Sequence, residues 1–565
     1  MRLRNILMGA SAAALIAPAA FAARGSDGEV KILYWQAISI MTPYLSQGTK
    51  DLEAASLVIE PLARYNEKGE LVPFLAESIP TVENGGVSAD LTTITWKLKD
   101  GLLWSDGTPV TADDAVFSWQ YCTAEGGGCA QITNFENVKS VEAVDPKTIK
   151  ITFTVPKPFP YGPLVGAQSP VIQKAQFANC LGPKAPECTE ANTKPIGTGP
   201  FMVTDFKAND VVTLAANPHF RDPAKPAFAT VLLKGGGDAA SAAQAVLATG
   251  EFDYAWNALV EPEILAQMAS AGKGEVISAF GTLVERIQVN QTDPSPTLGA
   301  ARSTVAHAHP FLTDERVVKA LSLAIDRDIL VETGYGEAGR PTCNLVPAPD
   351  FNASKNNNWC LKQDIDQANK LLDEAGWKMG PDNIRTKDGK KLSLLFQTSV
   401  NSVRQGSQAL IKQWWNEIGV EVELRQIDGG VFFGGDPGSP DTLEKFFADV
   451  EMYANNFDGT DPAKYLSDWQ CGQEPRPDTQ WQGGNVSRWC NKDFDALIAK
   501  FATTSGVEAR GKIAIELNDL IVNSPSIIPL IHRGRVSAKS KTLGGVLMNP
   551  WDSELWNAAD WYRLK

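Results

Sequence analysis

The sequence predicts an α/β protein built from more than one domain. Segments with the alternating hydrophobicity of strands and segments with the helical period follow one another along the chain, which favours sheets covered by helices. The chain has 565 residues, more than a single hydrophobic core usually holds, so at least two domains are expected. Hydrophobic residues make up 43% and charged residues 21% of the chain, a composition typical of a soluble globular protein.

Three elements are predicted in the first third of the chain. Residues 93–101, TITWKLKDG, alternate apolar and polar side chains and predict a half-buried strand. Thr111 and, three positions later, Asp114 form a capping box that predicts the start of a helix. Residues 138–153 predict a hairpin that turns at an Asp-Pro pair.

Three longer helices are predicted in the second half. Residues 313–331 have one apolar face and predict a single helix with Thr313 as its N-cap. Residues 366–377 predict a helix that ends at Gly376. Residues 407–428 predict a helix with tryptophans on its apolar face, a glycine stop and then a strand.

The N-terminus has the features of a cleaved signal peptide. Arg2 and Arg4 precede a short apolar stretch, and the small residues that end at Ala22 fit a cleavage site, so cleavage is predicted after Ala22. The apolar stretch is shorter than the roughly 20 residues that cross a bilayer. The first cysteine is Cys122, so no lipid anchor at a cysteine near the cleavage site is expected. These features predict a periplasmic protein that is not lipid-anchored.

Eight cysteines fall into four close couples that lie far from one another in the sequence. An exported protein can form disulfides, and nearest-neighbour pairing closes four local loops: Cys122–Cys129, Cys180–Cys188, Cys343–Cys360 and Cys471–Cys490. Structural zinc is the alternative, but no C-x-x-C occurs and no histidine lies near a couple, which disfavours it.

The charge of the chain argues against nucleic acid as a partner. The formal net charge is −14, and the loss of Arg2 and Arg4 with the signal peptide would make it −16. A strongly acidic protein is repelled by nucleic acid and by anionic membrane surfaces. The chain is therefore expected to work as a free soluble protein.

The usual catalytic motifs are absent. The sequence contains no G-x-S-x-G, no H-E-x-x-H and no Walker loop. His307 and His309 could chelate a metal, but a solvated loop is the favoured interpretation. No catalytic residue, no metal and no cofactor are therefore expected, and the α/β composition with several domains favours a binding protein whose ligand lies in a cleft between domains.

Seven segments, in order, resemble the extracellular solute-binding proteins of ABC importers, family 5, which include dipeptide- and oligopeptide-binding proteins. The segments are LVPFLAESIPTV at 71–82 followed by 93–121, PIGTGPF at 195–201, 317–342, 364–377, 408–424, NKDFDALI at 491–498 and SPSIIPLIHR at 524–533. They span almost the whole mature chain.

The resemblance implies the two-lobed periplasmic-binding-protein fold of class C (type II), with an extra subdomain in lobe I. On that basis lobe I would comprise 23–288 and 530–565, with the subdomain at roughly 61–190, lobe II would comprise 289–529, and the two crossover strands would lie near 285–291 and 527–533. It also implies a monomer that is not an enzyme. Such a protein closes its lobes over a small solute and delivers it to permease subunits in the inner membrane.

The resemblance also implies a ligand site in lobe II. In peptide-binding members, a buried aspartate three residues before an Asp-Pro pair binds the ligand's ammonium group, and Asp458 stands three before Asp461-Pro462. Asp461 itself is expected to be a turn or cap residue. Dipeptide-binding members carry a tryptophan where this chain has Asn455, so Phe457 is considered as the aromatic wall and the ligand need not be a dipeptide. A capping role for Asp458 is the alternative.

Three further groups of candidate residues complete the predicted site. Arg404 falls near the arginine that binds the ligand carboxylate in dipeptide-binding members, and an exposed arginine at the start of a helix is the alternative. Strand ends line the cleft in such folds, so the residues after two lobe I strands are also candidates, with core packing as the alternative: Trp35 and Gln36, then Trp256 and Asn257.

Four functions remain to be compared. The first is a receptor for a peptide or another amine-bearing solute, and the second is the same fold binding an oligosaccharide, an opine-like conjugate or a metal chelate. A secreted hydrolase would need a nucleophile that the sequence does not offer. A chaperone-like protein would bind many unfolded chains weakly.

Overall fold

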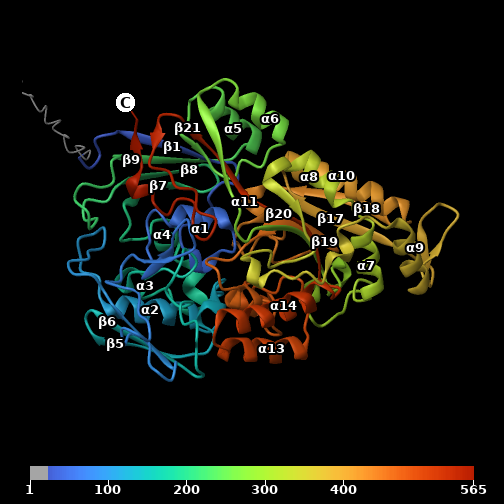
Figure 1. The fold of residues 1–565 in the computed structure, drawn as a ribbon, viewed down its shortest axis with the longest axis horizontal. Helices are drawn as coiled ribbons and strands as arrows, with labels where there is room; N and C mark the ends of the chain where they lie inside the picture. Colours follow the sequence, from blue (N-terminus) through green and yellow to red (C-terminus); the bar gives the residue numbers. More distant parts are fainter. Residues whose placement is uncertain (1–22, 565) are drawn as a thin grey trace, which may run out of the picture.

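The computed structural model describes residues 23–564, so the predicted signal peptide lies outside the described residues. Two large sheets organise the chain (Figure 1). We call the part built on the seven-stranded sheet lobe I and the part built on the six-stranded sheet lobe II. No helix within residues 23–564 combines the length and the apolar character needed to cross a membrane.

Lobe I is centred on a sheet in which the N-terminal strand pairs in parallel with two strands from the middle of the chain. The strand order is β11 (Gly274–Ala279), β21 (Arg535–Ser540), β10 (Tyr254–Ala255), β1 (Glu29–Tyr34), β9 (Thr230–Gly235), β8 (Val211–Ala216) and β7 (Phe201–Lys207). Alternate residues of β1 point to opposite faces. Ile32 and Tyr34 pack into the main core, whereas Leu33 packs beneath α5 (Ala239–Leu247) and α6 (Pro262–Ala269).

A three-stranded antiparallel sheet forms the small layer of lobe I, in the order β4 (Thr93–Lys97), β6 (Thr148–Phe153) and β5 (Val138–Asp145). It confirms the predicted strand and hairpin. Helix α2 (Ala112–Thr123) packs against it and begins with the predicted capping box between Thr111 and Asp114. The shorter helices of this lobe are α1 (Thr49–Ala55), α3 (Lys174–Phe177) and α4 (Thr189–Thr193), and its small ribbons are β2 (Ala63–Tyr65) with β3 (Leu71–Pro73) and β22 (Leu543–Gly544) with β23 (Tyr562–Arg563).

Lobe II is centred on a mixed sheet with helices on both faces (Figure 1). The strand order is β13 (Gly339–Pro341), β20 (Ile527–Arg533), β12 (Val284–Val289), β19 (Val450–Asn455), β17 (Ser393–Ser399) and β18 (Glu421–Ile427). One core lies under α7 (Glu315–Leu323), α8 (Arg327–Gly334), α9 (Ile365–Glu374) and α10 (Ser402–Glu417). The other lies under α12 (Ala463–Ser467), α13 (Lys492–Thr503) and α14 (Val507–Val522). A small ribbon, β14 (Lys378–Met379), β15 (Arg385–Lys387) and β16 (Lys390–Lys391), and α11 (Gly429–Phe432) complete the lobe.

The single helix predicted over 313–331 is wrong, because the segment forms two helices. Asp314, rather than Thr313, caps α7 by accepting a hydrogen bond from the backbone N–H of Arg316. The chain leaves the helix after Leu323, and the side chain of Asp326 then caps α8. A capping aspartate inside an apolar pattern lets a new helix start, although the hydrophobic face continues across the break.

The chain passes between the two sheets at two neighbouring places. It leaves lobe I after Ala279 and enters lobe II at Val284, and it returns between Arg533 and Arg535. β12 and β20 pair with each other in lobe II. The exact domain boundaries at 289 and 530 stay a prediction.

Four disulfides close local loops as predicted: Cys122–Cys129, Cys180–Cys188, Cys343–Cys360 and Cys471–Cys490. The first two lie in lobe I and the last two in lobe II. None of them links the lobes, so they do not restrict a movement of one lobe against the other.

The lobes touch each other at glycines. A Cβ atom on Gly48 of lobe I would lie 2.4 Å from the carbonyl oxygen of Phe433 in lobe II. A Cβ on Gly435 of lobe II would lie 2.2 Å from the carbonyl oxygen of Leu45 in lobe I. Because no side chain fits at these places, the main chains of the two lobes meet directly, and the structure represents a closed arrangement.

Candidate ligand-binding site

A cavity lies between the two lobes and is lined by side chains from both of them. Lobe I contributes side chains from the ends of its strands and from α1, among them Gln36, Gln47, Thr49, Trp256, Asn257 and Arg535. Lobe II contributes Arg286, Arg404, Tyr453, Asn455, Tyr465 and Trp469. The lining is therefore rich in aromatic and charged side chains, which is typical of a site that recognises a polar solute.

Five of the predicted site residues line this cavity: Gln36, Trp256, Asn257, Arg404 and Asn455. Trp256 stacks on Tyr34, with 4.8 Å between the ring centroids. Asn257 has a positive φ of 50°, which directs the chain away from β10 at the cavity edge. These residues are brought together from both lobes and from four separate stretches of the sequence.

Two predicted residues, Trp35 and Phe457, do not line the cavity. Trp35 belongs to the core beneath α5, and its indole N–H donates to the carbonyl of Asn257 at 2.7 Å. Phe457 lies in the core under α13 and α14, with its ring 5.4 Å from that of Tyr465. In each case a neighbouring residue faces the cavity instead, because successive side chains of an extended segment point to opposite sides.

Asp458 lines a smaller recess beside the cavity. The recess and the cavity share Gln47, Thr49, Asn455, Asn456, Asp468 and Arg535, so the two form adjoining parts of one site. The Oδ2 atom of Asp458 is buried and has no hydrogen-bond partner within residues 23–564. Burial, with the nearby carboxylate of Asp552, raises the pKa of Asp458 to about 8. At neutral pH the carboxyl group therefore lacks a counter-charge strong enough to keep it ionised.

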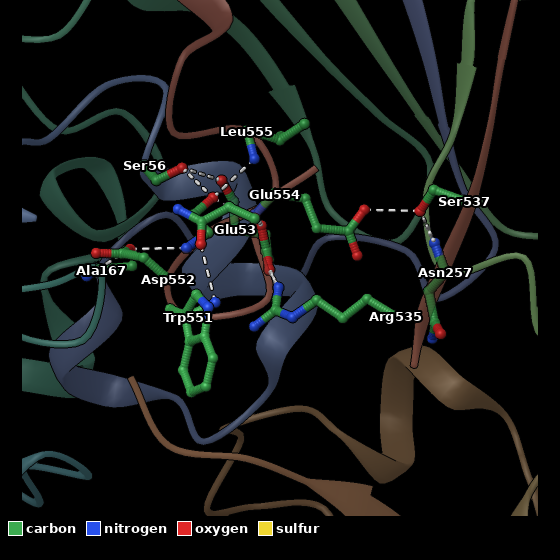
Figure 2. A network of polar contacts seen from close by, with 12 residues as sticks. Glu53, Ser56, Ala167, Asn257, Arg535, Ser537, Trp551, Asp552, Glu554 and Leu555 are labelled. Carbon is green, nitrogen blue, oxygen red and sulfur yellow. Dashed lines mark hydrogen bonds and ion pairs between the residues drawn. The ribbon is translucent and has the colours of Figure 1, made fainter. Parts of the chain in front are cut away.

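Asp458 belongs to an acidic cluster, which we define as Glu53, Asp458, Asp552 and Glu554. Figure 2 shows the three lobe I members gathered beside Arg535. Glu53 forms an ion pair with Arg535 and accepts hydrogen bonds at 2.6 Å from the Ser553 hydroxyl and the Glu554 backbone N–H. Burial nevertheless raises the pKa of Glu53 to about 7, since the attraction of Arg535 offsets it only in part.

The other two carboxylates of the acidic cluster are hydrogen-bonded. Asp552 lies 3.3 Å from Arg64 and accepts the backbone N–H groups of Tyr65 and Ala167. Glu554 accepts the hydroxyls of Tyr254 and Ser537 at 2.7 and 2.6 Å. Four carboxylates thus share two guanidinium groups, and the one carboxylate oxygen of the cluster that is buried without a partner belongs to Asp458.

Asp461 has a structural role, as expected for a turn or cap residue. Its Oδ1 accepts the backbone N–H of Ala463 at 3.0 Å, and Arg510 donates to both of its carboxylate oxygens at 2.8 Å. This bidentate pair ties the turn to α14. Asp461 therefore orients the segment that carries Asp458.

Arg404 belongs to an arginine cluster, which we define as Glu285, Arg404 and Arg533. Arg404 is only 2% exposed, so the alternative of an exposed arginine is wrong. Its Nε lies 2.8 Å from Glu285, and Arg533 lies 3.3 Å from the same carboxylate. Burial alone would raise the pKa of Glu285, but the two guanidinium groups outweigh it and lower the pKa. Arg404 thus already has a counter-charge within the protein.

Sequence reasoning missed several residues of the lining, above all Arg286, Arg533 and Arg535. The sequence does contain a signal for these residues, namely charged positions within apolar strand patterns. All six residues of β12, VERIQV, are buried although two are charged, and β20 ends in a buried arginine. Charged residues inside an otherwise apolar strand pattern indicate a polar site at the sheet end, since ionised groups are rarely buried without a partner.

The loop that carries the histidine pair is exposed at residues 305–308, as the solvated-loop interpretation expects, but one of the two histidines is buried. His309 is buried, and its Nε2 lies 2.9 Å from Asp449 Oδ1. The Nδ1 atom accepts the backbone N–H of Leu312 at 2.9 Å, whereas the side chain of His307 is exposed. Within the part of the chain that the structure describes, no three histidine, cysteine or acidic side chains are grouped to hold a metal ion.

Two lobes around a charged interlobar cavity define a solute-binding protein. The sequence profile of the bacterial extracellular solute-binding proteins, family 5 Middle, matches residues 70–475. The chain therefore belongs to the family 5 extracellular solute-binding proteins.

Relatives and solved structures agree with this assignment. The murein peptide-binding protein MppA of Escherichia coli K12 is 24% identical over 90% of this chain and 87% of its own length. The glutathione-binding protein GsiB of Shigella boydii is 24% identical over 95% of both chains. Protein XP55 of Streptomyces lividans is 26% identical, and the match spans 64% of that protein.

Two solved structures show the same fold. The oligopeptide-binding protein AppA of Bacillus subtilis, in complex with a nonapeptide, has a TM-score of 0.81 and 21% identity, and the match covers 96% of this chain and all of AppA. NikZ of Campylobacter jejuni, in complex with Ni(L-His), has a TM-score of 0.77 and 23% identity over 95% of this chain and 99% of NikZ.

Proposed function

We propose that this protein is the receptor of an ABC importer and captures a peptide or a similar amine-bearing solute. The observation that carries the proposal is the Asp458 carboxyl group, whose Oδ2 is buried without a partner beside the interlobar cavity. A solute ammonium placed there would supply the missing positive charge. Support also comes from the family and from relatives named for binding murein peptide and glutathione.

The proposed mechanism is closure of the lobes around the solute. Asp458 belongs to lobe II, whereas Glu53, Asp552 and Glu554 belong to lobe I, so closure gathers four carboxyl groups, and without a cation the protonated form of Asp458 is favoured. A cation bound between them would stabilise the ionised form of Asp458 only in the closed state. A ligand that binds one state better shifts the equilibrium toward it, and an ammonium-bearing solute would therefore favour closure.

Native mass spectrometry of the purified protein identifies any co-purified solute. Replacement Asp458→Asn is then expected to weaken binding of that solute at least about tenfold in a calorimetric titration, since a charge-assisted hydrogen bond becomes a neutral one. Asp366→Asn, on the surface of α9, is the matched control and should leave the affinity unchanged. An unchanged affinity for Asp458→Asn would remove this residue from the site.

The identity of the co-purified solute tests the proposed function as well. A neutral oligosaccharide or a metal chelate without an ammonium group would contradict it. We also propose binding without turnover, so mass spectra of the solute before and after prolonged incubation should be identical.

The remaining proposals concern where the protein works. We infer export to the periplasm with cleavage after Ala22, no lipid anchor, a monomeric state and delivery to permease subunits in the inner membrane. Mass spectrometry of the periplasmic protein tests the cleavage site, and an N-terminus other than residue 23 would correct it.

A further inference from the structure

Arg286 is a buried arginine of the cavity lining, and no carboxylate within residues 23–564 forms an ion pair with it. It lies on β12 and is 2% exposed. Its Nη1 donates to the hydroxyl of Tyr465 at 2.6 Å, and its guanidinium lies 5.2 Å from the centre of the Tyr453 ring. The Nε atom is buried without a partner, and no acidic side chain within residues 23–564 lies within ion-pair distance, 4.0 Å.

The carboxylates nearest to this part of the cavity are held by other groups. Glu285 is adjacent in sequence but points to the other face of β12, where Arg404 and Arg533 bind it. Asp468 accepts the hydroxyl of Thr133 at 2.6 Å and lies 3.2 Å from Lys464. Neither of these two carboxylates compensates the charge of Arg286 directly.

Glu451 lies behind Arg286 on the same face of the sheet, since Gln288 pairs with Glu451 and Arg286 pairs with Tyr453. One oxygen of Glu451 accepts the amide of Gln397 at 2.9 Å, and the other has no partner. Burial raises the pKa of Glu451 well above its ordinary value. Burial therefore favours the neutral form of this group, and Glu451 forms no ion pair with Arg286 within residues 23–564.

Tyrosine hydroxyls and ring faces orient a guanidinium but do not neutralise it. A buried charge requires an opposite charge, and a guanidinium fork fits a carboxylate in two parallel hydrogen bonds. Arg286 has donors left for such a partner, because only Nη1 donates to a protein group. The cavity that Arg286 lines is continuous with the Asp458 recess through shared lining residues.

We propose that Arg286 binds a carboxylate of the solute, so that the solute carries an anionic group at Arg286 and an ammonium group at Asp458. This inference rests on the proposed function and deepens it. Arg404, which the sequence suggested for the carboxylate, is already paired with Glu285, and Arg286 takes that role. The site thus selects zwitterionic solutes over simple amines.

Two tripeptide libraries test the proposal: one with free C-termini and one with amidated C-termini. Each is mixed with the protein after the co-purified solute is removed, and the retained peptides are counted by native mass spectrometry. The expected result is at least tenfold greater retention of the free acids. Enrichment of Asp and Glu within the amidated library would also support the proposal and would place the carboxylate on a side chain.

Variants of Arg286 test whether this residue causes the preference for peptides with a free C-terminus. Arg286→Gln should abolish the preference for free acids, and Arg286→Lys should keep part of it. Arg340→Gln, an exposed arginine on β13, is the matched control and should discriminate like the unmodified protein. If Arg286→Gln does not fold, retention of the two libraries by the unmodified protein is sufficient to test the proposal.

The outcomes separate this inference from the proposed function. Equal retention of both libraries without acidic enrichment, or an Arg286→Gln variant that still discriminates, would overturn the role of Arg286 and leave peptide binding intact. Retention of neither library would contradict the proposed function itself, and the inference would fall with it.

Discussion

The acidic cluster and the arginine cluster face the same cavity but are built differently. Glu285, Arg404 and Arg533 all belong to lobe II, and their charges pair within that lobe. The acidic cluster is assembled from both lobes, because Asp458 comes from lobe II and its other three members come from lobe I. The arginine cluster is therefore part of the fold of one lobe, whereas the acidic cluster exists in full only when the lobes are closed.

The arginine cluster therefore contributes to stability, and the acidic cluster to solute binding. Opposite charges that pair within one lobe stabilise it whether or not a solute is present. The carboxyl groups that meet across the lobes favour the protonated form of Asp458 until a cation binds, so we expect a cationic solute to stabilise the closed state. Variants of each cluster, and of the contact between the lobes, test this difference.

Removal of the shared carboxylate of the arginine cluster should have the largest effect. Glu285→Gln leaves two buried guanidinium groups without a counter-charge, and loss of one partner of a buried pair costs about 3–5 kcal/mol. The free energy of unfolding in urea should fall by that amount. Glu374→Gln, an exposed residue of α9, should change it by less than about 0.5 kcal/mol. A loss below about 1 kcal/mol for Glu285→Gln would show that the cluster does not stabilise lobe II.

Replacement of a glycine at the contact between the lobes should weaken binding without unfolding either lobe. A methyl group in Gly435→Ala would overlap the carbonyl of Leu45, so closure becomes unfavourable and affinity should fall at least about tenfold. Small-angle scattering should show a larger radius of gyration with solute present. Gly406→Ala, where α10 has open space, is the control. An unchanged affinity for Gly435→Ala would mean that this contact does not limit closure.

The acidic cluster should also make binding depend on pH. Asp458 has a pKa of about 8, above its unfolded value, so the free carboxyl is protonated below pH 8 and must lose its proton to pair with an ammonium. Affinity should therefore rise with pH up to about pH 8, by at most about tenfold per unit. Above that it should fall, because a peptide amine loses its own proton at about pH 8.

Calorimetry in two buffers of different ionisation enthalpy measures this dependence and should detect proton release at pH 6.5. The Asp458→Asn variant should lose most of the rising limb, and any part that remains is expected to come from Glu53, whose pKa is about 7. Glu285, whose pKa is lowered, stays ionised over this range, so the arginine cluster should not contribute. A flat profile for the unmodified protein would contradict the role of Asp458.

Local chemistry made much of the fold predictable from the sequence. The capping box at Thr111 and the glycine stop at Gly376 depend on neighbouring residues alone, and the structure has both. The close cysteine couples needed only short loops. The break between α7 and α8 was missed because a capping aspartate inside a continuous apolar face changes the chain direction without changing the pattern.

The site was less predictable because it depends on contacts between distant segments. Trp35 and Trp256 both follow lobe I strands, yet only the position of the helices beneath the sheet decides that Trp35 is core and Trp256 faces the cavity. Likewise, the sequence alone cannot decide whether Arg404 or Arg286 is free to bind a solute carboxylate, because the choice depends on Glu285 pointing to Arg404. Sequence patterns indicate which residues are unusual, and tertiary packing determines which of them keep a free charge.

The glycine contacts between the lobes have one more consequence. At Gly48 and Gly435 the lobes meet main chain to main chain, and side-chain hydrogen bonds such as that from Thr133 to Asp468 also join them. We expect a bound solute to change how often this closed arrangement is reached rather than its geometry. The outer surface of the occupied protein should then be similar for every accepted solute. Solutes would then be distinguished by their contacts inside the cavity, and the outer surface would differ only between the open and the closed arrangement.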